Sequence, residues 1–266
     1  MIKPGEIQKI ATAAGVRDPQ IEKDYILSWI LKGISQQKEL SELLVFKGGT
    51  VLKKFYFEDY RFSEDLDFTI TNTEITNEQL FQWFQEVFKY TKEEANIPLE
   101  IIDDNKHEDG SINFYIGYVG PLGGHGSNKK VKVDISKSEL IVFKSVTNIS
   151  FKEYSDLESF ELKCYPLEEV LVEKMRSIMQ RMQARDYYDI WYLMEEYGMN
   201  IAYYMNEFEA KCKHKGIDPR IFFTKLEQRI PQYKARWISS MKDQIKNLPN
   251  FEQVDREVQR QLKKIK

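Results

Sequence analysis

Apolar residues recur along this chain with two different periods, and each period predicts a different kind of element. Residues 5–36 and 77–95 carry apolar side chains at the spacing of three to four residues that is typical of helices. Short apolar or alternating runs indicate strands. The expected strands are 43–46, 66–70, 99–101, 111–119 and 131–135.

Helical spacing dominates the second part of the chain. Pro166 stands at a position where a helix can begin, and one long helix is expected from there to about residue 198. Residues 200–265 continue with helical patterns interrupted by glycine and proline. Because strand patterns give way to helical ones, we predict a core domain over 1–163 and a helical domain over 164–266. Strands and helices segregated in this way indicate an α+β fold.

Composition places the chain among globular proteins and excludes several classes. Of its 266 residues 42% are hydrophobic, which is enough to build a core. No apolar run reaches the roughly 18 residues of a membrane span, and the first residues do not resemble a signal peptide. Cys164 and Cys212 match no metal-ligand spacing and are expected to be reduced thiols. A cytoplasmic protein without a membrane partner is therefore predicted.

The net charge of −3 hides an asymmetry along the chain. Residues 211–266 hold 15 Lys and Arg against 6 Asp and Glu, whereas residues 1–210 have an excess of 12 acidic residues. A basic C-terminal part can approach a polyanion such as RNA. Solvated lysines on ordinary helices explain the same composition equally well.

A glycine pair follows the expected strand 43–46. In the sequence Lys47-Gly48-Gly49-Thr50 the glycines let the backbone turn tightly and approach a ligand, and the helix expected over 50–57 would point its free N–H groups at phosphate. The Thr50 hydroxyl can cap this helix or bind a phosphate oxygen, and Lys54, one turn later, can add a positive charge. The alternative is an ordinary strand–turn–helix connection.

Two carboxylates share one face of the next expected strand. Asp65 and Asp67 are two residues apart and point the same way, and they repel each other unless a cation joins them. Mg²⁺ suits such a pair, because it binds a few carboxylates together with substrate phosphates. Asp134, which shares a face with Lys132 in the expected strand 131–135, is a candidate third ligand. Solvated strand residues are the alternative.

The long helix expected from Pro166 carries a second group of charges. On one continuous helix, Lys174, Arg181 and Arg185 would form a cationic stripe. Asp186 and Asp189 would orient these cations, which could bind a triphosphate or a nucleic-acid backbone. An ordinary salt-bridged helix has the same appearance. The glycine-rich stretch 120–130, with His125, Lys129 and Lys130, completes the segments of interest.

Several of these segments together resemble a known family. The motifs that carry the resemblance are Phe46-Lys47-Gly48-Gly49-Thr50-x-Leu52-x-Lys54, Arg61-x-Ser63-x-Asp65-Leu66-Asp67, Lys174 with Arg185-Asp186-x-x-Asp189, and Ile21-Glu22-Lys23-Asp24-Tyr25. Over roughly residues 20–195 the chain is similar to the AbiEii/MenT family of nucleotidyltransferase toxins, from type IV-like toxin–antitoxin and abortive-infection systems.

The resemblance implies a polymerase-β-like nucleotidyltransferase core with a mixed twisted sheet, followed by a helical domain. It also implies that, with Mg²⁺, a nucleotide moves from an NTP to an acceptor, in characterised relatives the 3′ end of tRNA, which blocks translation or aborts phage infection. A separate antitoxin protein is the implied partner.

The same resemblance assigns roles to individual residues. Gly48, Gly49 and Thr50 correspond to the nucleotide loop, and Asp65 and Asp67 correspond to the metal ligands. Lys174 corresponds to a phosphate-binding or catalytic cation. Asp186, or Asp189 in the other register, corresponds to the acidic residue of the last motif.

Three alternatives remain open from the sequence. The acceptor can be a protein hydroxyl or a small molecule instead of RNA. An Asp-x-Asp pair also holds the metal in glycosyltransferases, although the preceding Gly-Gly-Thr turn argues against that class. The chain can also be a nucleotide- or RNA-binding module without catalytic activity.

Overall fold

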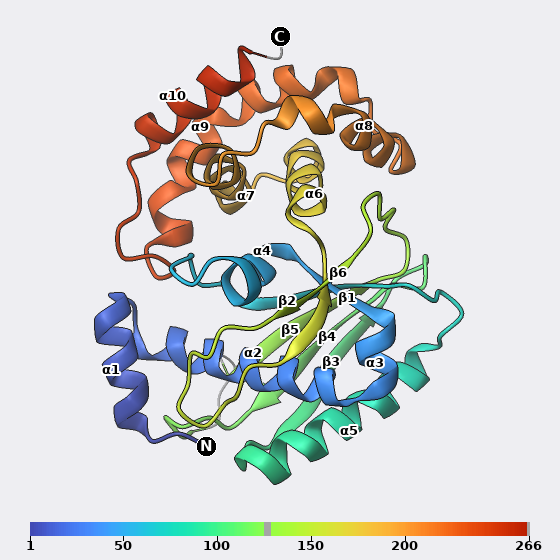
Figure 1. Cartoon of the computed structure of the whole chain (residues 1–266), viewed down its shortest axis with the longest axis vertical. Coiled ribbons are helices and arrows are strands. Elements are labelled where there is room, and N and C mark those ends of the chain that lie inside the picture. Colours follow the sequence, from blue (N-terminus) through green and yellow to red (C-terminus); the bar gives the residue numbers. More distant parts are fainter. Residues whose placement is uncertain (125–128, 265–266) are drawn as a thin grey trace. The chain divides into compact units, whose positions relative to one another are not determined.

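The computed structural model describes residues 1–124 and 129–264 (Figure 1). Within these residues the strands form one mixed seven-stranded sheet, in the order β3-β4-β5-β2-β1-β7-β6. The strands are β1 (Leu44–Lys47), β2 (Asp65–Ile70), β3 (Leu99–Lys106), β4 (Ile112–Tyr118), β5 (Lys130–Ser136), β6 (Val146–Ile149) and β7 (Glu161–Cys164). The predicted class, a mixed sheet with helices, is confirmed.

Helices occupy the ends of the chain and the connections between strands. The α-helices are α1 (Pro4–Ala14), α2 (Asp18–Gln36), α3 (Lys38–Leu43), α4 (Gly48–Val51), α5 (Asn77–Ala95), α6 (Leu167–Gln180), α7 (Ala184–Trp191), α8 (Met205–His214), α9 (Phe222–Met241) and α10 (Phe251–Leu262). Shorter turns are η1 (Leu52–Tyr56), η2 (Tyr192–Glu196), η3 (Ile201–Tyr204) and η4 (Pro219–Ile221). In the described ranges, none of the helices has both the length and the apolar character needed to cross a membrane.

The chain divides into two compact units. Unit 1 contains residues 1–139 and 145–164, and unit 2 contains residues 140–144 and 165–266. Unit 1 therefore holds the whole sheet with α1 to α5, and unit 2 holds α6 to α10. The division into domains at residues 163 and 164 stays a prediction.

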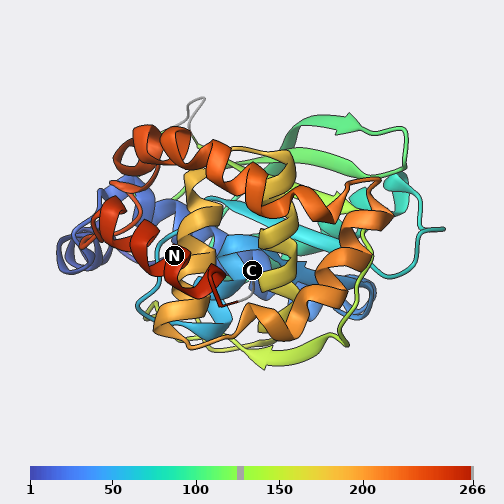
Figure 2. The same cartoon turned by 90° about the horizontal axis from the view of Figure 1, so that it is seen from above.

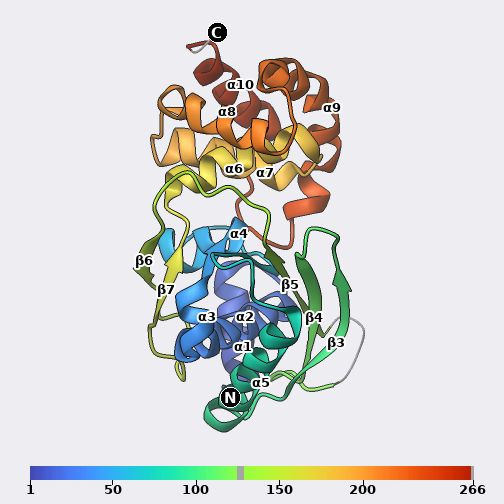
Figure 3. The same ribbon diagram turned by 90° about the vertical axis from the view of Figure 1, so that its right-hand side faces the viewer.

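The centre of the sheet in unit 1 is β2, which pairs antiparallel with β1 and parallel with β5. Alternate residues of β2, β4 and β5 are fully buried and apolar, as their sequence period predicts. Helices α2 and α5 cover this apolar face, as Figure 3 shows. From α5 the ring of Phe84 meets that of Phe114 edge-on at 5.0 Å between centroids.

Two short strands were not predicted from the sequence. β6 and β7 have four residues each, and three of the four side chains of β6 are exposed, so β6 resembles a loop. In β7 the buried Leu162 and Cys164 alternate with polar residues, which is a strand signal that the prediction missed. The helix expected over 50–57 also differs, because α4 begins two residues earlier at Gly48 and continues into the wider turn of η1. Residues 125–128, including His125, lie outside the described residues.

The prediction of a single long helix from Pro166 is wrong. α6 ends at Gln180, Arg181 is extended with φ −125° and ψ 156°, and α7 begins at Ala184. α9 runs across both helices (Figure 2), and its Arg229 donates to the carbonyls of Ile178, Met179 and Arg181. Because this guanidinium satisfies carbonyls at the end of α6, the break is stable although the local sequence contains no helix breaker.

Residues 140–144 are held in unit 2 by buried charges. The carboxylate of Glu169 accepts the N–H groups of Val142 and Phe143 at 2.9 and 2.8 Å. The ammonium group of Lys211 donates to the Leu140 carbonyl at 2.8 Å and lies 2.7 Å from Glu169. These bonds connect residues 140–144, which precede β6 and β7 in the sequence, to α6 and α8, which follow both strands.

A buried ionic cluster joins three segments of unit 1. Lys54 of η1, 2% exposed, forms ion pairs with Asp24 of α2 and with Glu153 of the segment between β6 and β7. Tyr154 donates its hydroxyl to Asp24 at 2.6 Å. Burial acts to lower the pKa of Lys54, but Asp24 and then Glu153 outweigh it and raise that pKa overall. Lys54 is therefore a structural cation.

We expect Lys54→Met to lower the free energy of unfolding by about 3–5 kcal/mol, because it leaves the Asp24 carboxylate buried without its cation. Chemical denaturation followed by circular dichroism measures this change. The control is Lys106→Met, which removes a 51%-exposed lysine paired with Glu78 and should cost less than about 1 kcal/mol. Equal losses in the two variants would contradict a structural role for the cluster.

Candidate active site

The two acidic residues of β2 lie on the polar face of the sheet. Asp65 and Asp67 are half-buried, whereas Leu66 and Phe68 between and after them are buried in the core. This arrangement follows from the two-residue period of a strand. The face carrying both carboxylates is opposite to the apolar face covered by α2 and α5.

The glycine turn meets this face at Asp67. Lys47, the last residue of β1, pairs with Asp67 in the antiparallel ladder. Gly48 follows with φ +82°, a conformation that L side chains rarely adopt. A Cβ atom added at Gly48 would overlap the carboxylate of Asp67. It would lie 3.1 Å from Cγ and 3.2 Å from Cβ of Asp67. Glycine is therefore needed both for the turn and for the close approach of the carboxylate.

Two further contacts fix the turn. The Thr50 side chain is buried, and its hydroxyl donates to the backbone carbonyl of Asp65 at 2.6 Å. The Thr50 hydroxyl thus ties the start of α4 to the start of β2. The guanidinium of Arg61 lies so close to Gly49 that a Cβ there would be 2.6 Å from Nη2. Arg61 is itself 2% exposed, so it is a positive charge built into the base of the turn.

The neighbouring strand β5 adds an ion pair to the same face. Its register places Lys132 opposite Asp65 and Asp134 opposite Asp67. Nζ of Lys132 lies 2.7 Å from Oδ2 of Asp134. Partial burial acts to lower the pKa of Lys132, but Asp134 and, more weakly, Asp65 and Asp67 raise it overall. All three carboxylates therefore interact electrostatically with Lys132.

The strand register brings Asp134 next to the acidic pair, as predicted, and the three-carboxylate metal site itself stays a prediction. In the ranges that the structure describes, no three His, Cys, Asp or Glu side chains form a group that could hold a metal ion. Asp134 is instead paired with Lys132, which takes the place of a cation beside it. The pair Asp65 and Asp67 remains a suitable set of hard oxygen donors for a cation completed by substrate oxygens.

The prediction that Lys54 binds phosphate does not fit the structure. Although Lys54 follows Thr50 by one helical turn, its ammonium group is buried between Asp24 and Glu153. Sequence spacing located the residue on the correct element but could not show that the side chain turns into the interior.

The charged residues of the last motif lie within unit 2. Lys174 of α6 is 4% exposed, and its ammonium group lies 2.7 Å from Asp186 and 2.7 Å from Asp189 of α7. Arg181 donates to Asp186 at 2.7 Å. Both acidic residues therefore orient Lys174. Burial acts to raise the pKa of Asp186, but Lys174 and Arg181 outweigh it and lower that pKa overall.

The predicted cationic stripe is wrong in its geometry. Lys174, Arg181 and Arg185 do not share one helix, because the chain is extended between α6 and α7. The side chain of Arg181 is 56% exposed beyond the end of α6, and Arg185 is half-buried in the first turn of α7. Lys174 and Arg181 nevertheless share the carboxylate of Asp186.

Two residues near the glycine turn were not assigned a role from the sequence. Arg61 stood in the Arg61-x-Ser63-x-Asp65 motif, but nothing in its spacing indicated contact with Gly49. Lys132 was recognised as sharing a face with Asp134, and its position opposite Asp65 depends on a strand pairing that sequence spacing does not reveal. Only the register of β2 with β5 brings it to the site.

A family described as nucleotidyl transferase AbiEii toxin, type IV TA system, matches residues 29–260 of the chain. This range includes the glycine turn, both acidic residues of β2 and the charged residues of unit 2. No curated protein matches the sequence.

Solved structures share the fold at low sequence identity. The nucleotidyltransferase toxin MenT4 from Mycobacterium tuberculosis H37Rv aligns with a TM-score of 0.60 and 15% identity, covering 100% of both chains. JHP933 from Helicobacter pylori aligns with a TM-score of 0.58 and 17% identity, covering 94% of each chain. A putative nucleotidyltransferase from H. pylori aligns with a TM-score of 0.54 and 17% identity, covering 94% of this chain and 97% of the other.

We expect Gly48→Ala to destabilise the protein more than Gly198→Ala. Both glycines have a positive φ, +82° and +83°, so the backbone strain is matched at about 1–2 kcal/mol. Space around Gly198 is open, whereas a Cβ at Gly48 overlaps Asp67, which adds about 1–3 kcal/mol. Denaturant unfolding of both variants measures the difference. Equal losses of stability would show that Asp67 is not held against the turn.

Asp186 should couple the stability of unit 2 to acidic pH. Its pKa is lower in the folded chain than in the unfolded chain, so the unfolded chain binds the proton first as the pH falls. The stabilisation is present above the ordinary value near 4 and is lost as the pH falls from there through the lower pKa of the folded chain. In Asp186→Asn the free energy of unfolding should therefore depend less on pH in this range.

Acid titrations of unfolding free energy for Asp186→Asn and wild type test this coupling. The control is Asp218→Asn, since Asp218 pairs with an 87%-exposed arginine and its interaction is screened by water. An identical pH dependence in wild type and Asp186→Asn would refute the coupling.

Proposed function

We propose, since this chain belongs to the AbiEii family of nucleotidyltransferase toxins of type IV toxin–antitoxin systems, that it transfers a nucleotide from an NTP to the 3′ end of an RNA. Membership of the family makes the chain a nucleotidyltransferase with an NTP as substrate and a cognate antitoxin as partner. tRNA as the acceptor, Mg²⁺ as the cofactor, a cytoplasmic location, and arrest of translation or abortion of phage infection as the outcome belong to the proposal.

The observation that carries the proposal is the close approach of Asp67 to the Gly48 turn. Nucleotidyl transfer needs two features side by side, a backbone that binds the departing phosphates and carboxylates at the reacting phosphorus. The turn offers backbone N–H groups at the start of α4, and β2 offers Asp65 and Asp67 on the polar face. Arg61 under Gly49 adds positive charge beneath the turn.

Asp65 and Asp67 fit a divalent cation. Both are half-buried carboxylates on one face, so their oxygens can be shared between the cation and substrate phosphates. When bound, such a cation would polarise phosphate oxygens and offset their negative charge. Asp134 would become a third ligand only where Lys132 releases it, because Asp134 forms an ion pair with Lys132.

In this mechanism a hydroxyl oxygen of the acceptor attacks the α-phosphorus of the NTP. A new P–O bond forms as the bond to the departing pyrophosphate breaks, and the hydroxyl proton leaves to solvent or to a carboxylate. The N–H groups of residues 48–50 bind the outgoing phosphates, and the rate arises mainly from positioning and charge neutralisation.

The charged residues of unit 2 stay candidates for anion binding in the proposal. The ammonium group of Lys174 lies between Asp186 and Asp189, so these carboxylates hold it in place. The side chain of Arg181 is more than half exposed, so it is available to a phosphate of a nucleotide or of an RNA backbone, as is the half-buried Arg185.

We expect Asp65→Asn and Asp67→Asn to fold normally and to lower nucleotide transfer at least about a hundredfold, because each removes a charge at the reacting centre. The assay incubates protein with each radiolabelled NTP, Mg²⁺ and total RNA, and sequencing of the labelled RNA identifies the acceptor. The matched control is Asp104→Asn, an exposed position on the edge strand β3, which should keep full activity.

Two results would contradict the proposal. Full activity of Asp67→Asn would remove the carboxylates from the mechanism. Label transferred to protein or to a small molecule, with none on RNA, would replace the acceptor while keeping the enzyme class.

A further inference from the structure

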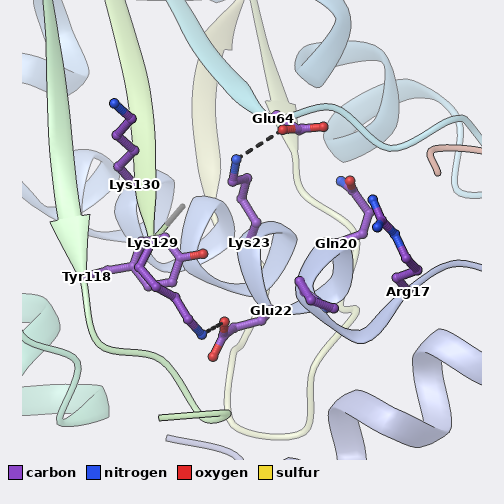
Figure 4. Close-up of a pocket in the computed structure, with 9 residues that line it drawn as sticks. Arg17, Gln20, Glu22, Lys23, Glu64, Tyr118, Lys129 and Lys130 are labelled. Carbon is purple, nitrogen blue, oxygen red and sulfur yellow. Dashed lines mark hydrogen bonds and ion pairs between the residues drawn. The ribbon is translucent and has the colours of Figure 1, made fainter. Parts of the chain in front are cut away.

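A second polar site lies in unit 1 beside the acidic residues of β2. It is a pocket of about 470 Å³ between the start of α2, the end of β4 and the start of β5 (Figure 4). Its lining includes four cations, Arg17, Lys23, Lys129 and Lys130, against two carboxylates, Glu22 and Glu64. The pocket therefore has an excess of positive charge in a protein whose net charge is negative.

Both carboxylates of the pocket already have a cation. Glu64 accepts from Lys23 at 3.0 Å, and Glu22 forms an ion pair with Lys129 (Figure 4). Glu22 also accepts the N–H of Leu122 at 2.8 Å. The two carboxylates that line the pocket are thus matched by Lys23 and Lys129, and the positive charge of Lys130 favours an anionic ligand.

An unsatisfied donor in the lining points to the same chemistry. Gln20 is 8% exposed, and its Nε2 is buried without a hydrogen-bond partner among the described residues. A buried N–H₂ group in this condition costs free energy unless a ligand accepts its hydrogen bond. Gln20 lines the pocket, where the oxygen of a phosphate would supply the missing acceptor.

The strand register connects the pocket to the acidic residues. Lys130 is two residues before Lys132 in β5 and shares its face, and Lys132 lies opposite Asp65. Along the strand this separation is roughly 7 Å. The ammonium group of Lys130 lies 4.2 Å from the centre of the Tyr115 ring, whose position in β4 is opposite Lys132. Lys130 is therefore held where the pocket joins the polar face.

The order of strands separates the pocket from the glycine turn. β2 lies between β1, which leads into Gly48, and β5, which begins at Lys130. If the NTP phosphates occupy the turn, as proposed above, the pocket lies on the other side of the acidic residues. That side is where the second substrate of the reaction must enter.

We propose that this pocket binds backbone phosphates of the acceptor RNA near its 3′ end, with Gln20 and Lys130 as contacting residues. This assignment rests on the proposed function, since it identifies the acceptor side of the same site. Because Lys23 lies between Gln20 and Lys130 (Figure 4), the two residues would contact different phosphates, one accepting from Nε2 of Gln20 and another from the ammonium group of Lys130.

The test measures binding without turnover. A fluorescently labelled single-stranded RNA of about ten nucleotides is titrated with full-length protein in EDTA, at several salt concentrations, by fluorescence anisotropy. Lys130→Gln should weaken binding about tenfold and reduce the slope of log K against log salt by about 1. Lys152→Gln, which removes a 51%-exposed lysine outside the pocket, is the charge-matched control and should bind as wild type.

Gln20→Leu separates a ligand contact from a structural role. Because the substitution removes an unsatisfied donor, the melting temperature should be equal to or above that of wild type, while RNA binding weakens. A lower melting temperature with unchanged RNA binding would assign Gln20 to the core and overturn its role here. Lys130→Gln, at a half-buried position, tests the pocket independently of this outcome.

A second arm distinguishes RNA phosphate from nucleotide phosphate. The KM for NTP should be unchanged in Lys130→Gln, while the KM for RNA rises. A raised KM for NTP with unchanged RNA binding would assign the pocket to the triphosphate and overturn the inference. Normal RNA extension by wild type, with RNA binding unaffected by either substitution, would overturn the pocket assignment alone. Failure of wild type to bind or extend any RNA would overturn the proposed function as well.

Discussion

The approach of the Asp67 carboxylate to the backbone of Gly48 is the constraint on which the site depends. It requires the antiparallel register that pairs Lys47 with Asp67, and it requires a residue without Cβ at the turn. A shift of one residue in that register would send Asp65 and Asp67 into the apolar core. The turn, the strand pairing and the acidic pair are therefore one interdependent arrangement.

Burial separates the charges of this protein into two groups. Lys54 and Lys174 are almost fully enclosed, and each lies between two carboxylates. Enclosed charges of this kind hold segments in a fixed geometry, because the loss of one partner leaves the other unpaired in a poorly solvated place. Asp65, Asp67 and Lys132 are only half-buried, so water reaches them. The chemistry is thus assigned to the second group.

Sequence reasoning succeeded where the local pattern determines the structure. The two-residue period of β2 predicted that Asp65 and Asp67 share a face, and the glycine pair after a short apolar run predicted the turn. Sequence reasoning failed where residues far away in the sequence determine the local structure. The break after Gln180 depends on Arg229, 49 positions further along the chain, and the inward path of Lys54 depends on Asp24 and Glu153. Gln20 stood in a helix with no feature to distinguish it, because an unsatisfied donor is visible only in three dimensions.

The assignment of residues 140–144 to unit 2 has a consequence for the synthesis of the chain. These residues leave the ribosome before β6 and β7, yet the ammonium group that binds the Leu140 carbonyl belongs to Lys211, 71 positions later. At about 5–20 residues per second, the segment waits several seconds for its partner. Unit 1 can complete its sheet during that interval, while residues 140–144 form an unattached loop between β5 and β6. In a fragment that ends at residue 164, residues 140–144 would lack their partners Glu169 and Lys211 altogether.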